Sequence, residues 1–164
     1  AWWDLVTGRR KAFFGRCSTI GVKVAFSRDG RWFAAAGHDG RMKVWEVTSQ
    51  QGKAISGGFR NGLHDVTLSA NGQRLAASGS GPNGVVRLWD VETGRDVLTL
   101  PGEPGCFFPH IGFSADGNTL FAASLERKVL LWHAPSWTEI EAKENQRAAA
   151  KPSEGPRARP VSPA

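Results

Sequence analysis

The sequence predicts an all-β protein in which a unit of four short antiparallel strands repeats along the chain. Two observations carry this prediction. Tryptophans that follow an apolar or aromatic residue recur at separations of 42, 44 and 43 residues, at Trp3, Trp45, Trp89 and Trp132. A Ser-containing turn that ends in Gly precedes the last three of them by 18, 20 and 18 residues, counted from Ser to Trp. Four strands in a period of about 43 residues are typical of a β-propeller blade.

The first complete repeat shows how its residues specify the strands. Val22, Val24 and Phe26 occupy alternate positions, which is the period of two of a strand. The next apolar run is continuous, which favours a strand buried on both faces, and Gly-containing turns separate the strands. The expected elements are, in order, a strand over 22–26, a turn at 28–30, a strand over 32–36, a turn at Asp39-Gly40, a strand over 42–47 and a short strand over 53–56.

The same pattern divides the whole chain. We expect a partial β-propeller of about three and a half four-stranded blades, with the end of one blade at 1–14 and successive blades at 15–56, 57–100 and 101–135. Ser136 and Glu139 have the spacing of a capping box, which predicts a short helix over 136–148. Residues 149–164 are basic and rich in Pro and Ala, and we expect this tail to be disordered.

The residues around the tryptophans match a known family. Trp3-Asp4 and Trp89-Asp90 carry a literal Trp-Asp pair, Trp45-Glu46 is a conservative version, and Trp132-His133 departs from it. Over roughly residues 1–135 the chain resembles the WD-repeat (WD40) family. The resemblance implies a non-catalytic scaffold for protein interactions that needs no cofactor.

A narrower resemblance concerns the end of the repeats. Residues 131–137, followed by an acidic segment, are similar to the end of bacterial propellers that are attached to kinases or other signalling modules. This short match implies a bacterial signalling or regulatory protein. Because Ala1 falls in the middle of a blade, we expect further blades of a larger propeller to precede it. The alternative is that copies of the chain associate to complete a ring.

One feature of the family is absent from the sequence. In typical blades a Gly-His pair lies about eleven residues before the Ser, and its His bonds to an Asp in the turn before the Trp. Asp39 holds the Asp position, and Asn83 and Glu126 replace it in the next two blades. The His positions hold Cys17, Phe59 and, with a shift of one residue, Glu103. We therefore expect apolar contacts between neighbouring sheets to replace the polar network.

The chain lacks the patterns of common catalytic and metal sites. Its four His residues have no zinc-ligand spacing, and two Cys residues are too few for a disulfide framework. Gly79 to Gly84 reads G-x-G-x-x-G, but a strand follows it instead of the helix that a dinucleotide site needs. We expect no catalytic, cofactor or metal site. A catalytic propeller whose site lies in other blades is the alternative.

In a propeller, the loops that lead into the blades and the middle hairpins of the blades lie on one rim. We expect a protein or peptide, acidic in character, to bind there, because Arg and aromatic side chains are frequent in binding hot spots. The candidates are Arg16, His38, Phe59, Arg60, Phe107, Arg127 and Lys128. The alternative for Phe59 and Phe107 is that they pack the loops onto the blades.

The net charge of +6 is concentrated toward the C-terminus. From Lys143 onward, five Lys and Arg residues stand against two Glu residues. Such a tail can contact nucleic acid, which makes a nucleic-acid-contacting module a further alternative. No apolar run reaches the roughly 20 residues of a membrane helix. We expect a soluble domain, either cytoplasmic or the extracytoplasmic part of a membrane-anchored signalling protein.

Overall fold

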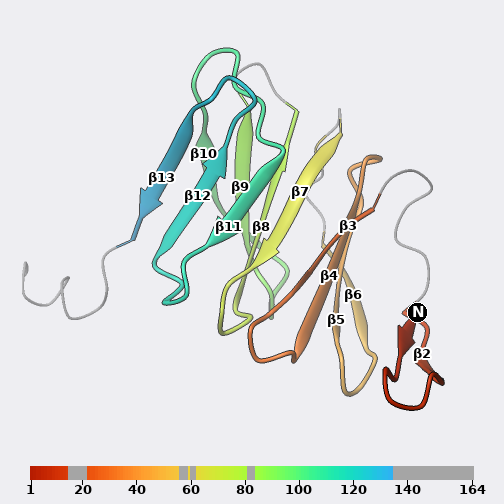
Figure 1. Ribbon diagram of the computed structural model, residues 1–164. Helices are drawn as coiled ribbons and strands as arrows, with labels where there is room; N and C mark the ends of the chain where they lie inside the picture. The colour runs from red at the N-terminus through yellow and green to blue at the C-terminus, as the bar shows by residue number, and fades with distance from the viewer. Residues whose placement is uncertain (15–21, 56–58, 60–61, 81–83, 135–164) are drawn as a thin grey trace, which may run out of the picture. The chain divides into compact units, whose positions relative to one another are not determined.

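The computed structural model describes residues 1–14, 22–55, 59, 62–80 and 84–134. In these residues every regular element is a strand, and the strands form antiparallel sheets that follow one another along the chain (Figure 1). The expected all-β class is confirmed for this part of the protein. The helix expected at 136–148 and the tail expected at 149–164 lie outside the described residues.

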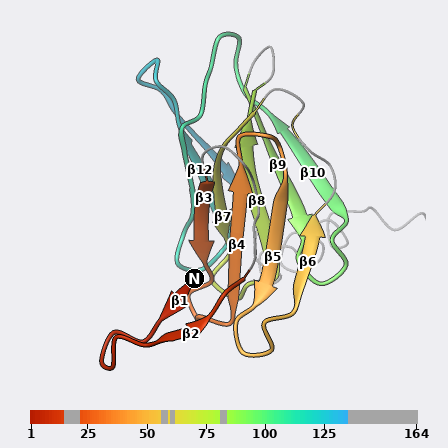
Figure 2. The same ribbon diagram turned by 90° about the vertical axis from the view of Figure 1, so that its right-hand side faces the viewer.

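Each sheet is built from strands that are consecutive in the sequence. The first holds β1 (Trp2–Trp3) and β2 (Arg10–Ala12). The second holds β3 (Val22–Phe26), β4 (Trp32–Gly37), β5 (Met42–Glu46) and β6 (Gly52–Ile55), which Figure 2 shows side by side in that order. The third holds β7 (Leu63–Leu68), β8 (Arg74–Gly79), β9 (Val85–Asp90) and β10 (Asp96–Pro101). The fourth holds β11 (His110–Phe113), β12 (Thr119–Ala123) and β13 (Val129–His133).

The periodic tryptophans occupy equivalent places in these sheets. Trp45 lies on β5, Trp89 on β9 and Trp132 on β13, and each of these is the third strand of its sheet. Each Trp stands opposite an apolar residue of the second strand; these partners are Phe33, Leu75 and Leu120. The spacing of the tryptophans therefore predicts their strand positions correctly.

The Ser-containing turn keeps the same hydrogen bonds in all three repeats. The hydroxyl oxygen of Ser27 accepts a hydrogen bond from the backbone N–H of Trp32 at 2.9 Å, and its O–H donates to Asp29. Ser69 and Ser114 accept the equivalent N–H bond, also at 2.9 Å. The Gly that ends the turn has φ angles of 69°, 68° and 76° in the three copies, which suit Gly because it has no Cβ. The turn is therefore defined by its own side chains.

Neighbouring sheets pack face to face through two apolar clusters. The first joins the β3–β6 sheet to the β7–β10 sheet and includes Val44 and Trp89. The second joins the β7–β10 sheet to the β11–β13 sheet and includes Phe108 and Leu120, with Trp132 packed against it. The core thus lies between successive sheets, as in a propeller.

Trp89→Ala should lower the free energy of unfolding by about 3–5 kcal/mol, because it removes a large side chain that is fully buried between two sheets. Trp3→Ala is the matched control. Trp3 holds the equivalent motif position but is 53% exposed, so its loss should cost less than about 1 kcal/mol. Urea unfolding followed by circular dichroism measures both values. Equal losses for the two variants would contradict the prediction.

Candidate functional site

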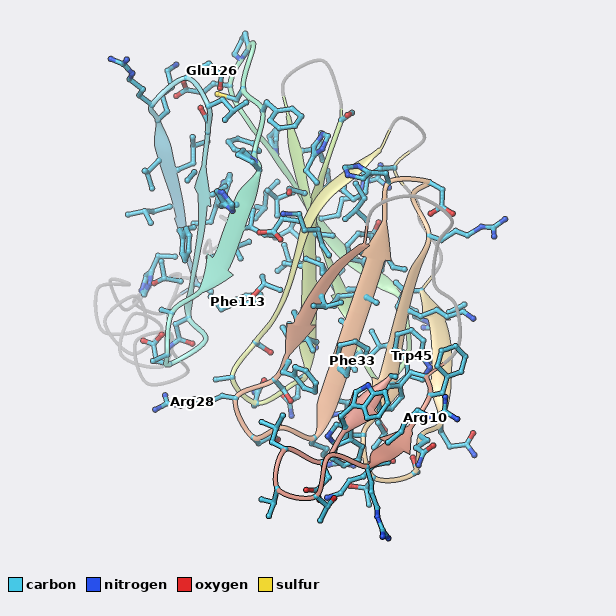
Figure 3. All side chains as sticks on the ribbon, turned by 45° about the vertical axis from the view of Figure 1, so that its right-hand side comes forward. Arg10, Arg28, Phe33, Trp45, Phe113 and Glu126 are labelled. Carbon is cyan, nitrogen blue, oxygen red and sulfur yellow. The ribbon has the colours of Figure 1, made fainter. Side chains whose placement is uncertain are left out.

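Two kinds of segment meet at one end of the sheets. They are the hairpins between the second and third strands and the loops that lead into β7 and β11, and together we call them the loop rim. The backbone N–H of Ser80 donates a hydrogen bond to the carbonyl of Gly62, and that of Gly102 donates to Gly84, both at 3.0 Å. The β8–β9 hairpin is therefore tied to both of these loops. The opposite end carries the Ser-containing turns, and Figure 3 shows Glu126 and Arg28 at these two ends.

A cluster of polar and aromatic side chains lies on the loop rim. The rings of His64 and Phe107 lie 3.9 Å apart between centroids, and those of His64 and His38 lie 6.4 Å apart. His64 Nε2 shares a hydrogen bond of 2.9 Å with the hydroxyl of Ser80. Burial lowers the pKa of His64, because it disfavours the charged imidazolium, and the nearby His38 lowers it further.

The sequence identified only half of this cluster. His38 and Phe107 were expected on the rim, and the structure brings both of them to His64. His64 and Ser80 were missed, although His64 lies at the start of a strand directly after an inter-blade loop. That position was the available signal, since residues at such strand ends face the rim.

The β12–β13 hairpin brings charge to the same rim. The carboxylate of Glu126 accepts hydrogen bonds from the Ser124 hydroxyl at 2.6 Å and from the backbone N–H of Phe107 at 3.3 Å. These donors, the Ser124 hydroxyl first, lower the pKa of Glu126. Lys128 forms an ion pair with Glu103, which raises the pKa of the Lys128 ammonium. Glu126 is therefore held by the hairpin and the loop, and Lys128 is neutralised by a neighbour.

Arg127 stands between these two residues with a φ angle of 63° and an exposed side chain. Within the described residues it has no ion-pair partner. Arg16 and Arg60, two further candidates for the rim, lie outside the described residues.

The repeats also match known proteins. Residues 12–46 and 52–90 agree with the family model of the WD domain, G-beta repeat. The chain carries WD40 repeats. The chain is also similar to part of protein tipD of Dictyostelium discoideum, which is 31% identical over 123 residues, or 75% of this chain and 19% of tipD.

Two further relatives show the same partial coverage. The WD repeat-containing protein SL1-17 of Schistosoma mansoni is 30% identical over 77% of this chain and 41% of its own length. The small ribosomal subunit protein RACK1 of Caenorhabditis elegans is 32% identical over 85% of this chain and 42% of its own length. The chain thus spans less than half of each of these three relatives, all of them eukaryotic.

In these WD40 repeats the acid after the Trp closes the turn to the fourth strand. Asp4 accepts hydrogen bonds from the backbone N–H groups of Val6 and Thr7, both at 2.9 Å. Asp90 accepts the N–H of Thr93 at 2.8 Å, and this bond lowers the pKa of the Asp90 carboxyl. The acid of the Trp-Asp motif therefore stabilises the turn that follows the Trp.

The structure corrects the assignment of Phe59 to the loop rim. Phe59 is only 6% exposed, and its ring lies edge-on to Trp89 with 6.3 Å between centroids. Phe108 has the same relation to Trp132, also at 6.3 Å. Phe59 therefore packs its loop onto the next blade, which was the alternative for this residue.

The same contacts occupy the place of the His of typical WD40 blades. In the loop before the third sheet, Phe59 occupies the position of that His, as the sequence indicates. Before the fourth sheet it is Phe108 that reaches the Trp, whereas Glu103, which the spacing had suggested, is exposed and pairs with Lys128. Asp39 accepts the N–H of Arg41 at 3.1 Å within its own hairpin.

The described residues contain no group of three or more His, Cys, Asp or Glu side chains that could hold a metal ion. Nor does any helix among them have the length and apolar character to span a membrane. The chemical groups that the described part of the loop rim presents are aromatic faces, imidazoles and an exposed guanidinium.

Gly79→Ala should destabilise the protein by about 1–3 kcal/mol, because the added methyl group would overlap the buried ring of Phe59. Gly112→Ala is the matched control. Its methyl group would meet the ring of Phe121, which is 38% exposed and can turn away, so the cost should stay below about 1 kcal/mol. Thermal or urea unfolding of the two variants tests this, and the reverse order would refute it.

The free energy of unfolding should fall as the pH is lowered through about 6.5, the ordinary pKa of His. The pKa of His64 is lower in the folded protein, so the unfolded chain takes up the proton first and acid favours unfolding. Urea unfolding between pH 8 and pH 5.5 measures the slope. His64→Gln, which retains a partner for Ser80, should reduce this slope. An unchanged slope in the variant would assign the pH dependence to another group.

Proposed function

We propose that these WD40 repeats form a non-catalytic scaffold that binds an acidic segment of a partner protein on the loop rim. The observation that carries the proposal is the convergence of His38, His64 and Phe107. The hairpin of the exposed Arg127 adjoins this cluster, because its Glu126 accepts a hydrogen bond from the backbone N–H of Phe107. Aromatic and Arg side chains contribute most strongly at protein interfaces, where they bury large areas and form directed hydrogen bonds.

The charges on the rim favour an acidic partner. Lys128 is paired with Glu103, and Arg41, whose side chain is 77% exposed, is paired with Asp39, but Arg127 has no such partner among the described residues. Arg16 and Arg60 add two further cations in the loops that lead into the blades. Leu125, 68% exposed at the tip of the β12–β13 hairpin, adds an apolar contact point.

The relatives support a role in assembly. RACK1 of Caenorhabditis elegans is, by its name, a protein of the small ribosomal subunit and so a member of a larger complex. The bacterial signalling context rests on the short similarity of residues 131–137 alone, and the relatives described above give it no support.

Reversing one charge on the loop rim should weaken partner binding. A partner captured with the chain should bind Arg127→Glu about three- to tenfold more weakly at low salt, and added salt should reduce the difference because exposed charges are screened. Arg28→Glu, at the opposite end of the β3–β6 sheet, is the control and should bind normally. Surface plasmon resonance measures both affinities.

If Arg28→Glu weakens binding and Arg127→Glu does not, the partner binds the opposite rim and the proposal is wrong. The nucleic-acid alternative is tested separately by removing residues 143–164. Loss of binding to a DNA duplex in that variant, with partner binding unchanged, would assign nucleic-acid contact to the tail.

A further inference from the structure

The rim opposite the loop rim contains a groove that the proposed function does not use. It lies between the β3–β6 sheet and the β7–β10 sheet, where the Ser-containing turns and the Trp-Asp turns of the two blades meet, and we call it the turn-rim groove. Its volume is about 580 Å³, within the range of ligand-binding pockets. Trp32, Asn71, Gln73 and Glu92 are among the residues that line it.

The repeat geometry fixes the walls of this groove. In each blade a backbone hydrogen bond joins the two turns: the N–H of Val47 donates to the carbonyl of Arg31 at 2.8 Å, and the N–H of Val91 donates to that of Gln73 at 3.0 Å. The groove is therefore bordered by hydrogen-bonded backbone on both sides. A ligand would meet a preformed shape and would not need to order it.

The charged side chains of the groove leave one carboxylate in excess. Arg31 pairs with Glu46 at 3.0 Å, and Arg74 pairs with Asp90. Both guanidinium groups are therefore neutralised by the acids of the Trp-Asp turns. Glu92 lines the groove as a third acid, and no ion pair joins its carboxylate to a cation among the described residues. Lys53 donates its hydrogen bond to the backbone carbonyl of Glu92 instead.

Trp32 gives the groove a surface that accepts cations. Its indole ring is half-buried, and the guanidinium of Arg31 already lies 5.5 Å from the ring centroid. Gly72 packs so closely against the ring that a Cβ at this position would overlap it. The ring is thus held in place in the wall of a groove that Glu92 also lines. An aromatic face and a carboxylate in one groove are a favourable combination for a guanidinium group.

We propose that the turn-rim groove binds an arginine side chain of a partner peptide. The guanidinium forms a two-pronged hydrogen bond with the Glu92 carboxylate and lies against Trp32. The side-chain amides of Asn71 and Gln73, which bond each other at 3.1 Å, stand where the peptide backbone would pass. An anion would find no free guanidinium among the lining residues, because Arg31 and Arg74 are already paired and Glu92 is the acid left over; the Lys53 ammonium lies nearby, bonded to the backbone carbonyl of Glu92.

This proposal is independent of the loop rim and is tested with a defined probe. The probe is the blocked peptide acetyl-Gly-Ser-Arg-Ser-Gly-amide, titrated into the ¹⁵N-labelled chain and followed by NMR. We expect shifts of the indole N–H of Trp32 and of the side-chain amides of Asn71 and Gln73, saturating at millimolar peptide. The same peptide with Glu in place of Arg should shift none of these signals.

Two matched variants make the test specific. Glu92→Gln should weaken the response to the arginine peptide by about tenfold, which corresponds to one charge-assisted hydrogen-bond pair. Asp96→Asn, which removes an acid on β10 outside the groove, should leave it unchanged; Asp96 is 42% exposed and lies 3.9 Å from Arg87.

If the arginine peptide does not shift the signals of Trp32, Asn71 and Gln73, the proposal is wrong. An unchanged response of Glu92→Gln, or equal responses to the arginine and glutamate peptides, would also overturn it. Because each variant is compared with its own peptide-free spectrum, a variant that fails to fold is recognised before the titration, and Glu92→Ala then takes the place of Glu92→Gln.

Discussion

The contact between an aromatic residue of an inter-blade loop and the Trp of the following blade holds successive sheets together. Phe59 meets Trp89 in this way and Phe108 meets Trp132, each with 6.3 Å between ring centroids. Three of these rings are nearly or fully buried, and aromatic side chains of this size bury about 150–250 Å² each. Because no His–Asp pair directs these loops, their position depends on ring packing, and the absence of a Cβ at Gly79 makes room for Phe59.

The loop rim follows from this anchoring. Phe108 is fixed in the core, and the hydroxyl of Ser78 donates a hydrogen bond to its carbonyl at 2.8 Å. The preceding residue, Phe107, is therefore held at the surface, where its ring meets His64. A surface group placed by a buried neighbour loses little freedom when a partner binds, so packing inside the protein lowers the entropic cost of recognition outside it.

The sequence predicts those features of the fold that repeat and are local. The period of about 43 residues places the tryptophans on third strands, and the strands of the first complete repeat lie within one residue of their expected bounds. The sequence left two places open for Phe59, on the rim or packed onto the blade, because a single loop residue has no period that would reveal its direction. His64 and Ser80 meet across two strands, and the turn-rim groove lies between two sheets. The His64–Ser80 contact and the groove both depend on how strands and sheets pack, which the spacing of residues in the sequence does not specify.

The two rims differ because their side chains are constrained differently. On the turn rim most polar groups close turns: Asp29 and Asp116 bond the Ser of their own turn, and these hydroxyl donors lower the pKa of both carboxyls. Such residues cannot change without loss of the turn. Glu92 is different, since it follows Val91 at a position where the preceding repeat has Thr48, and its side chain is exposed. Positions of this kind can change without loss of the turns, and among the residues that line the groove Glu92 is the acid without an ion pair.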